Sequence, residues 1–329
     1  MSTPIDTVLA ILRDEETFVL TTHVNPDGDG IGSEIALAEW LSAHHKEVRI
    51  INHSPTPEVY RFLDPKGRIL IFNPERDAEL IASADVIVVL DINHPGRLRS
   101  MESNVLESRA VKICIDHHPD PAPFARHYLL DDDATSTGEI VYRVLTADRK
   151  EGLEPLVAQA LYCAIITDTG SFRYPRVDPE IFRIAAHLVE CGADPVAIYS
   201  EVYQKWSTGR VHLLGEMLAG LELSEGGALA HITVTREMLS RTGTTEEDTD
   251  NFTNYPMNVD GVLAGILFLE LQDGLKISFR SRGEISINEL AKEFGGNGHK
   301  NAAGARIEGG SLEEVRPRVL KAARKYVTR

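Results

Sequence analysis

The sequence predicts an α/β protein with an N-terminal, mostly parallel sheet flanked by helices, a helical connector, and a smaller C-terminal α/β domain with a mixed sheet. Three observations predict this organisation. Short apolar runs alternate with helical periods in the first half, the pattern becomes mostly helical after about residue 195, and strand candidates return beyond Gly226-Gly227. The length of 329 residues is enough for two domains at roughly 150 residues each.

The predicted strands of the first domain are short and apolar. Phe18–Thr22 and Val48–Ile51 are β-rich runs that each follow or precede a helical pattern. Asp85–Leu90 and Val111–Ile115 are nearly continuous apolar runs. Such runs are typical of strands that are buried on both faces of a parallel sheet.

The predicted helices of the first domain repeat their apolar residues at a helical period. They are expected over Ile31–Ala43, Thr135–Leu145, Pro155–Thr167 and Pro179–Glu190. The second of them opens with Ser136 and Glu139, which have the spacing of a capping box.

The rest of the chain predicts a connector and a second domain. Residues 196–223 form the connector, so the expected boundaries are 1–195, 196–223 and 224–329. In the last part, strands are expected over Ala228–Val234, Val262–Leu271, Leu275–Arg280 and Ala302–Ile307. Helices are expected over Ile287–Phe294 and Leu312–Tyr326, and a glycine-rich loop precedes the final strand.

Charge and composition exclude several classes of protein. With 34 basic and 50 acidic residues the net charge is −16, and no basic footprint for long duplex nucleic acid is visible. No apolar run approaches the roughly 18 residues of a membrane span, and the first residues have neither the basic nor the apolar region of a signal peptide, so we expect none. The three cysteines contain no CxxC pair, which argues against disulfides and structural zinc. We therefore expect a cytoplasmic protein without a membrane partner, acting on short anionic molecules; a homodimer is left open.

Side chains that commonly bind metals follow the predicted strands. His23, Asp91 and Asp116-His117-His118 each come directly after an apolar strand, and Asp168 ends a fourth apolar run. Asp27 and Asp29 lie in the Pro- and Gly-containing turn after the first strand. Ligand sites of open α/β sheets lie at the carboxyl ends of strands, so we expect these groups at one sheet edge. So many carboxylates together are unstable without cations.

The residue types favour a site for two divalent ions. Two ions roughly 3.5–4 Å apart share a carboxylate and can activate a bridging water. Mixed carboxylate and imidazole ligands suit Mn²⁺, two per active site, with Mg²⁺, Co²⁺, Fe²⁺ or Zn²⁺ as alternatives. The run Asp131-Asp132-Asp133 is interpreted as a solvated helix cap instead of a further metal site.

Four segments resemble, in order and spacing, the motifs of the DHH phosphoesterase family: His23-x-Asn25-Pro26-Asp27-x-Asp29, Asp91, Asp116-His117-His118 and Asp168-Thr169-Gly170. The loop Gly295-Gly296-Asn297-Gly298-His299, followed by Asn301-Ala302-Ala303-Gly304, is similar to the signature of the associated C-terminal domain of that family. The two-domain length resembles the stand-alone members, the oligoribonuclease and phosphoadenosine-phosphate phosphatase group.

The resemblance implies roles for the residues of the first domain. One metal ion would take His23, Asp27 and Asp91, and the second would take Asp29, Asp91, His117 and Asp168, with Asp91 bridging the two. Asp116 would orient a histidine, His118 would face the scissile phosphate as donor and general acid, and Arg97 would contact a phosphate.

In the second domain the resemblance implies a substrate-binding site. It would consist of Arg280 and of Gly296, Asn297, Gly298 and His299 in the glycine-rich loop. Asn297 departs from the glycine usual in the family at that position, and asparagine tolerates a positive φ better than most residues.

The expected function is hydrolysis of short oligoribonucleotides and linear dinucleotides such as pApA, and of 3′-phosphoadenosine 5′-phosphate to AMP, by two-metal activation of a bridging hydroxide. Three alternatives stay open. A cyclic di-AMP phosphodiesterase would use the same motifs. An inorganic pyrophosphatase would resemble the first domain but lack the glycine-rich loop. A nucleotide sensor would bind without catalysis.

Overall fold

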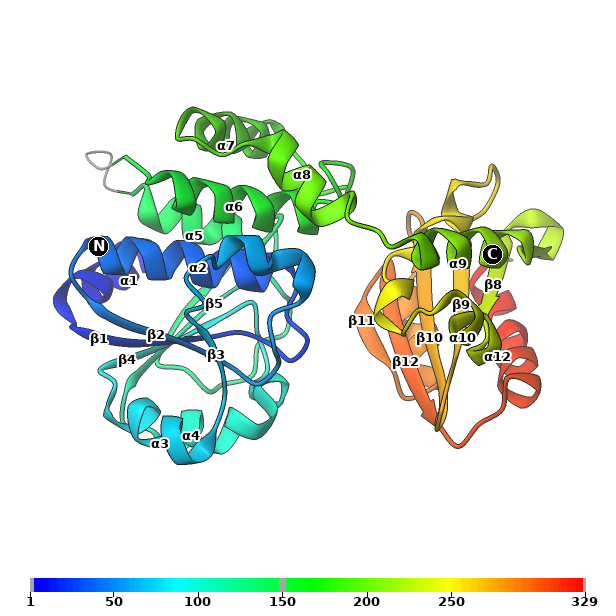
Figure 1. Cartoon of the computed structure of the whole chain (residues 1–329), viewed down its shortest axis with the longest axis horizontal. Helices are drawn as coiled ribbons and strands as arrows, with labels where there is room; N and C mark the ends of the chain where they lie inside the picture. The colour runs from blue at the N-terminus through cyan, green and yellow to red at the C-terminus, as the bar shows by residue number, and fades with distance from the viewer. Residues whose placement is uncertain (1–2, 148–151, 328–329) are drawn as a thin grey trace. The chain divides into compact units, whose positions relative to one another are not determined.

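The computed structural model describes residues 3–147 and 152–327, which form two compact units that divide between Lys205 and Trp206 (Figure 1). Residues 1 and 329, the outer limits of the predicted domains, lie outside the described residues. Each unit contains a six-stranded sheet with helices packed on it. In the described part of the chain, no helix has the length and apolarity that crossing a bilayer requires.

The sheet of the first unit is entirely parallel and has the strand order β3-β2-β1-β4-β5-β6. Its strands are β1 (Thr17–Thr21), β2 (Glu47–Asn52), β3 (Ile69–Ile71), β4 (Val86–Leu90), β5 (Val111–Asp116) and β6 (His127–Leu130). The four strands predicted from the sequence are β1, β2, β4 and β5, and they occupy the centre of the sheet. The two edge strands, β3 and β6, were not predicted.

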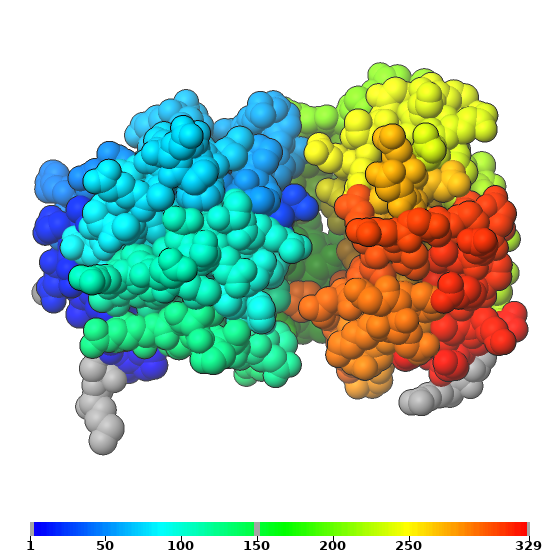
Figure 2. Space-filling model, turned by 90° about the horizontal axis from the view of Figure 1, so that it is seen from below, coloured from blue at the N-terminus to red at the C-terminus, as the bar shows by residue number. Residues whose placement is uncertain are grey.

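Helices cover both faces of this sheet. They are α1 (Pro4–Asp14), α2 (Gly28–Ala43), α3 (Pro74–Ser83), α4 (Glu102–Glu107), α5 (Thr137–Leu145), α6 (Pro155–Asp168), α7 (Pro179–Glu190) and α8 (Pro195–Tyr203). Figure 1 shows α2, α5 and α6 above the sheet and α3 and α4 below it. Figure 2 views the first unit from below, where the segment containing α3 and α4 covers the sheet.

Side chains of the central strands alternate between two cores. Val88 and Leu90 of β4 belong to the core under α2, α5 and α6, whereas Ile87 and Val89 belong to the core under α3 and α4. All four are fully buried. This explains the continuous apolar run, because a strand covered on both faces needs apolar residues at every position.

Among the described residues of the first unit, five helices begin at a proline, and four of these prolines follow a residue whose side chain caps the helix. Asp178 and Asp194 cap the helices that start at Pro179 and Pro195, and each accepts two backbone N–H groups. Proline is well suited to the first helical position because it lacks an N–H that would have no partner there. The helix predicted from residue 135 begins at Thr137 instead, after the N-cap Ser136.

Glycines allow α2 to pack directly against α6. A Cβ on Gly32 would lie 2.4 Å from the carbonyl oxygen of Ala160, so a side chain there requires the helices to move apart. This contact matters for the site because α2 starts in the loop that carries Asp27 and Asp29.

We expect Gly32→Ala to destabilise the first unit by about 2–3 kcal/mol, because overpacking a rigid backbone contact has a cost of that order. The thermal midpoint would fall by roughly 5–10 °C. Gly215→Ala is the matched control, since no atom lies within 4 Å of a Cβ at this helical position. Its midpoint should stay unchanged or rise slightly. Equal midpoints for Gly32→Ala and the wild type would show that the helices can separate without cost.

The second unit has a mixed sheet of order β11-β12-β10-β9-β8-β7, in which only the β8–β9 pair is parallel. This confirms the predicted fold class. The strands are β7 (Glu222–Ser224), β8 (Leu229–Val234), β9 (Ala264–Leu271), β10 (Gly274–Ser281), β11 (Asn297–His299) and β12 (Ala302–Glu308). The helices are α9 (Thr208–Ala219), α10 (Arg236–Thr242), α11 (Ile287–Glu293) and α12 (Leu312–Val327).

The two helices within residues 196–223 belong to different units. Ile198 and Val202 of α8 are buried in the core of the first unit. Leu213 and Met217 of α9 are buried in the second unit, against one face of its sheet. Helices α11 and α12 pack on the opposite face.

Two details of the glycine-rich segment differ from expectation. Asn297–His299 forms the short edge strand β11 instead of a loop, because it pairs with β12. The positive φ angles fall on Gly295 and Gly298, not on Asn297. Asparagine at position 297 therefore places no strain on the backbone.

Candidate metal centre

The carboxyl ends of β1, β4 and β5 bring the predicted metal ligands together. β1 and β4 are neighbours at the point where the strand order reverses, which is where ligands bind in open α/β sheets. His23 follows β1, Asp91 follows β4, and His117 follows β5. Asp168 was expected at the same sheet edge, but it is the last residue of helix α6, which reaches the edge from above the sheet.

A first group of ligands surrounds the imidazole of His23. Its Nε2 lies 3.2 Å from Oδ2 of Asp91 and 3.8 Å from Oδ1 of Asp27. Its Nδ1 donates to the carbonyl oxygen of Val24 at 2.9 Å, which leaves the lone pair of a neutral ring on Nε2. That atom is buried and has no hydrogen-bond partner among the described residues. A lone pair facing two carboxylates is stable only with a cation between them, so the group fits a metal ion.

A second group surrounds the imidazole of His117. Its Nε2 lies 3.5 Å from Oδ2 of Asp168, 3.7 Å from Oδ1 of Asp91 and 3.8 Å from Oδ2 of Asp29. Asp91 thus takes part in both groups, with Oδ2 toward His23 and Oδ1 toward His117. A carboxylate placed between two ligand groups is the arrangement that a two-metal site requires.

Local structure holds three of the four aspartates of these groups in place. Asp27 is the N-cap of α2 and accepts the N–H groups of Asp29 and Gly30. Asp29 accepts the N–H groups of Thr137 and Gly138, at 2.7 and 2.8 Å, at the start of α5. Asp91 has a φ of +60°, and its N–H donates to Ile115 of the neighbouring strand. Left-handed backbone at a residue other than glycine is uncommon and clusters at functional sites.

The directions of the pKa shifts at the two ligand groups indicate an excess of negative charge there. Burial, together with the charges of Asp91 and Asp168, raises the pKa of Asp29 well above its ordinary value. Burial and the charges of Asp27 and Asp91 do the same to the pKa of Asp168. Although burial opposes it, the carboxylates of Asp27 and Asp91 raise the pKa of His23 to about 10. The site therefore binds positive charge strongly, as a proton or as a metal ion.

His118 and Asp116 form a pair beside the second group. Nδ1 of His118 donates to Oδ1 of Asp116 at 2.7 Å, and Asp116 also accepts the N–H of His117. Although burial opposes it, the bond to Asp116 raises the pKa of His118, so the ring carries a proton more readily. Nδ1 also lies 3.5 Å from Asp91, and Asp91, His117 and His118 form a further combination that could hold an ion.

Arg97 lies on the β4 side of the centre. Its guanidinium Nη1 is 3.5 Å from the carbonyl oxygen of Asp91, and its own carbonyl accepts the N–H of Val24. Arg97 therefore links the segment after β4 to the segment after β1.

Several supporting residues were missed by the sequence analysis. Asn52, at the end of β2, accepts the N–H of Thr22 at 3.1 Å and donates to the buried carboxyl of Glu34 at 2.8 Å. The hydroxyl of Ser54 accepts the N–H of Asn25 at 3.0 Å. Burial raises the pKa of Glu34 to about 8. A charged residue on the otherwise apolar face of the helix at Ile31–Ala43 was the available signal for this network.

The predicted substrate residues of the second unit lie on neighbouring strands. Arg280 on β10 and His299 on β11 are both paired with Ala302 of β12, one from each side. Directly paired residues of antiparallel strands share a face of the sheet, so Arg280 and His299 flank Ala302 on one face. Nε of Arg280 donates to Oδ1 of Asn254 at 3.1 Å.

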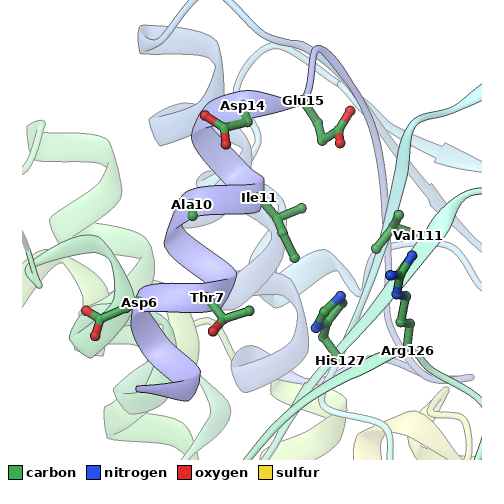
Figure 3. A pocket seen from close by; sticks show the side chains of 9 residues that line it. All are labelled: Asp6, Thr7, Ala10, Ile11, Asp14, Glu15, Val111, Arg126 and His127. Carbon is green, nitrogen blue, oxygen red and sulfur yellow. The ribbon is translucent and has the colours of Figure 1, made fainter. Parts of the chain in front are cut away.

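Two other features lie apart from these groups. Asp131 is paired with Arg143, while Asp132 and Asp133 are exposed, as in a solvated run. A surface hollow of about 430 Å³ lies between α1 and the start of β6. Figure 3 shows Thr7 and Ile11 of α1 on one side of it and Arg126 and His127 on the other. None of the predicted site residues lines this hollow.

If these groups hold metal, binding should stabilise the first unit. At a Mn²⁺ concentration about 100 times the dissociation constant, the gain is about 2.7 kcal/mol. We expect the thermal midpoint of chelator-treated protein to rise by roughly 5–10 °C on adding Mn²⁺. Asp133→Asn, in the exposed run, should retain the full rise, whereas Asp91→Asn should lose most of it. The same rise in Asp91→Asn and the wild type would place the bound ions elsewhere.

Comparison with known proteins gives consistent matches over most of the chain. Residues 17–165 match the DHH family, N-terminal domain, and residues 229–329 match the DHHA1 domain. The sequence is 31% identical over 320 residues to the bifunctional oligoribonuclease and PAP phosphatase NrnA of Thermus thermophilus, covering 96% of this chain and 91% of the relative.

Solved structures show the same fold. An exopolyphosphatase-related protein from Bacteroides fragilis matches with a TM-score of 0.94 and 32% identity, over 99% of this chain and 96% of the other. RecJ of Thermus thermophilus in complex with Mn²⁺ matches with a TM-score of 0.58 and 15% identity, over 99% of this chain and 55% of RecJ.

Proposed function

This chain belongs to the DHH family, and on that premise we propose that it is a metal-dependent phosphoesterase that cleaves short oligoribonucleotides and phosphoadenosine phosphate. The relative from Thermus thermophilus is named for both activities and is matched over nearly its full length. The likeness to a RecJ structure that contains Mn²⁺ supports manganese as one of the ions that the site accepts.

One observation carries the proposal. The two oxygens of Asp91 face two different imidazoles, His23 and His117, each of which is accompanied by further carboxylates. A single metal site, or a structural ion pair, does not need one carboxylate between two such groups. Two-metal phosphoester hydrolysis does, because two ions can then act on the same phosphate.

The ligand sets follow from the two groups. His23, Asp27 and Asp91 would hold one divalent ion, and Asp29, Asp91, His117 and Asp168 would hold the other. When bound, such a pair of ions supplies a nucleophile at neutral pH and neutralises charge on the phosphoryl oxygens. Mn²⁺ suits this donor set, and Mg²⁺, Co²⁺ or Fe²⁺ could replace it.

The predicted site residues that bind no metal would contact the substrate, or would orient a residue that contacts it. His118, oriented by Asp116 and with a raised pKa, would donate a proton through Nε2 to the leaving oxygen. Arg97 would contact a nonbridging phosphate oxygen. In the second domain, Arg280, Gly296, Asn297, Gly298 and His299 would bind the far end of the substrate. We retain 1–195, 196–223 and 224–329 as the proposed catalytic, connecting and substrate-binding parts.

A product time course with Mn²⁺ tests the function. We expect mononucleotides from pApA and AMP from 3′-phosphoadenosine 5′-phosphate, with little degradation of a long RNA. Cyclic di-AMP and pyrophosphate complete the panel. Asp91→Asn, purified in the same way, controls for a contaminating nuclease. Equal degradation of long RNA, or cleavage of pyrophosphate alone, would contradict the proposal.

A further inference from the structure

The carboxylates of the metal centre would balance the charge of the two ions, which leaves the charge of the substrate phosphate to other cationic groups. Asp27, Asp29, Asp91 and Asp168 bring four negative charges, which two divalent ions would just balance. A terminal phosphate adds nearly two more negative charges at neutral pH. Arg97 is one cation near the centre, on the side of β4, and the segment after α6 carries another on its own side.

Arg176 lies on that side. Its Nη1 donates to the carbonyl oxygen of Ala134 at 3.4 Å, just before the segment whose Thr137 and Gly138 hold Asp29. No carboxylate in the described part of the chain lies within ion-pair distance of it. Arg176 follows the proposed ligand Asp168 by eight residues, and its contact at Ala134 lies three residues before Thr137, whose N–H holds Asp29.

Tyr174 lies near Arg176 in the turn of residues 169–176, which follows α6. Its N–H donates to the carbonyl of Thr169, and its ring covers Gly170, where a Cβ would lie 2.5 Å from the ring. Tyr174 as a whole residue is nevertheless 44% exposed. Phe172, in contrast, is half-buried and stacks on Phe182 at 5.3 Å, which anchors the turn to α7.

The backbone of this turn is held in an unfavourable conformation. Gly170, Ser171 and Phe172 all have φ angles near +60°. Left-handed backbone has a cost of roughly 1–2 kcal/mol for a residue with a Cβ, and it persists where the surroundings fix it, often at ligand-binding segments. The conformation presents Tyr174 and Arg176 from a rigid turn that begins directly after Asp168.

We propose that Arg176 and Tyr174 form a substrate contact on the catalytic unit, in which the guanidinium binds a phosphate oxygen and the ring stacks on a nucleobase. This rests on the proposed function, because the ligand is a nucleotide. Arginine suits phosphate oxygens through its fork of donors, and base stacking tolerates any base sequence. The contact would favour nucleotides over pyrophosphate, which has no base.

Binding and turnover should both report the contact. For Arg176→Gln we expect the KM for pApA, and the Kd for a pApA analogue with a non-hydrolysable linkage, to rise by roughly 10- to 100-fold. For Tyr174→Leu we expect a rise of roughly 5- to 100-fold, which disappears when the analogue lacks the stacked base. Because both contacts already form in the bound substrate, kcat should change less than twofold.

Matched controls exist for both variants. Arg183→Gln removes an exposed arginine that is paired with Glu180 on α7. Tyr199→Leu removes a tyrosine with 43% exposure on α8, nearly the same as Tyr174. Both controls should bind and turn over pApA like the wild type. Thermal midpoints within 2 °C of the wild type would show that all four variants are folded.

The binding and turnover measurements distinguish a failure of the proposed contact from a failure of the proposed hydrolase function. Wild-type affinity and KM in both Arg176→Gln and Tyr174→Leu would overturn the contact while leaving the hydrolase intact. Weakened analogue binding in these variants, with no hydrolysis by the wild type, would support the contact and overturn the proposed function. A wild-type protein that neither binds nor cleaves would overturn both.

Discussion

Replacing Asp91 with asparagine is expected to lower kcat/KM for pApA by at least about 1,000-fold, which corresponds to about 4 kcal/mol of transition-state stabilisation. The reason is geometric. Asp91 faces His23 through one oxygen and His117 through the other, so a neutral amide weakens both ligand groups at once. Its left-handed backbone is unchanged, because asparagine adopts positive φ readily.

Metal content should be measured together with activity. Wild-type protein is expected to retain two Mn²⁺ per chain after equilibrium dialysis, and Asp91→Asn fewer than two. Asp133→Asn, in the exposed acidic run, serves as the control and should keep both activity and metal. If Asp91→Asn retains two ions and more than a trace of activity, the bridging assignment is wrong.

Replacing His118 with glutamine should lower kcat for pApA by roughly 100- to 10,000-fold, the usual contribution of a positioned acid. Asp116 holds Nδ1 of His118 at 2.7 Å and raises its pKa, which prepares the ring to give a proton. A p-nitrophenyl nucleotide ester has a leaving group that needs no proton. With this substrate the loss should shrink to about tenfold or less.

The comparison of leaving groups distinguishes the possible roles of His118. An equal loss with both substrates would mean that His118 positions the phosphate or holds an ion, as its place beside Asp91 and His117 would also allow. Metal analysis of the variant separates those two roles. His212→Gln, on α9 and outside every predicted motif, is the control and should have wild-type rates with both esters.

The centre of the fold could be predicted because its strands are buried on both faces. β4 consists entirely of apolar residues and β5 mostly so, and such runs predict burial. The edge strands β3 and β6 could not be predicted, since they are short, partly exposed, and defined by pairing with a neighbour. The same holds for β11, whose glycine and polar residues have no strand character of their own.

The candidate site was predictable where its residues follow strands and not where they meet through packing. His23, Asp91 and His117 were found because each follows an apolar run. The bonds that hold Asp29 come from residues more than 100 positions away, and only the packing of α5 against α2 creates them. Asp168 reaches the site from the end of helix α6 instead of from a strand.

The most direct test of the metal centre is anomalous diffraction from a crystal grown with Mn²⁺. Two manganese peaks should appear, one beside His23 and one beside His117, with the carboxylate of Asp91 between them. An empty site at saturating Mn²⁺, or a single peak that Asp91 does not touch, would contradict the two-metal hydrolase.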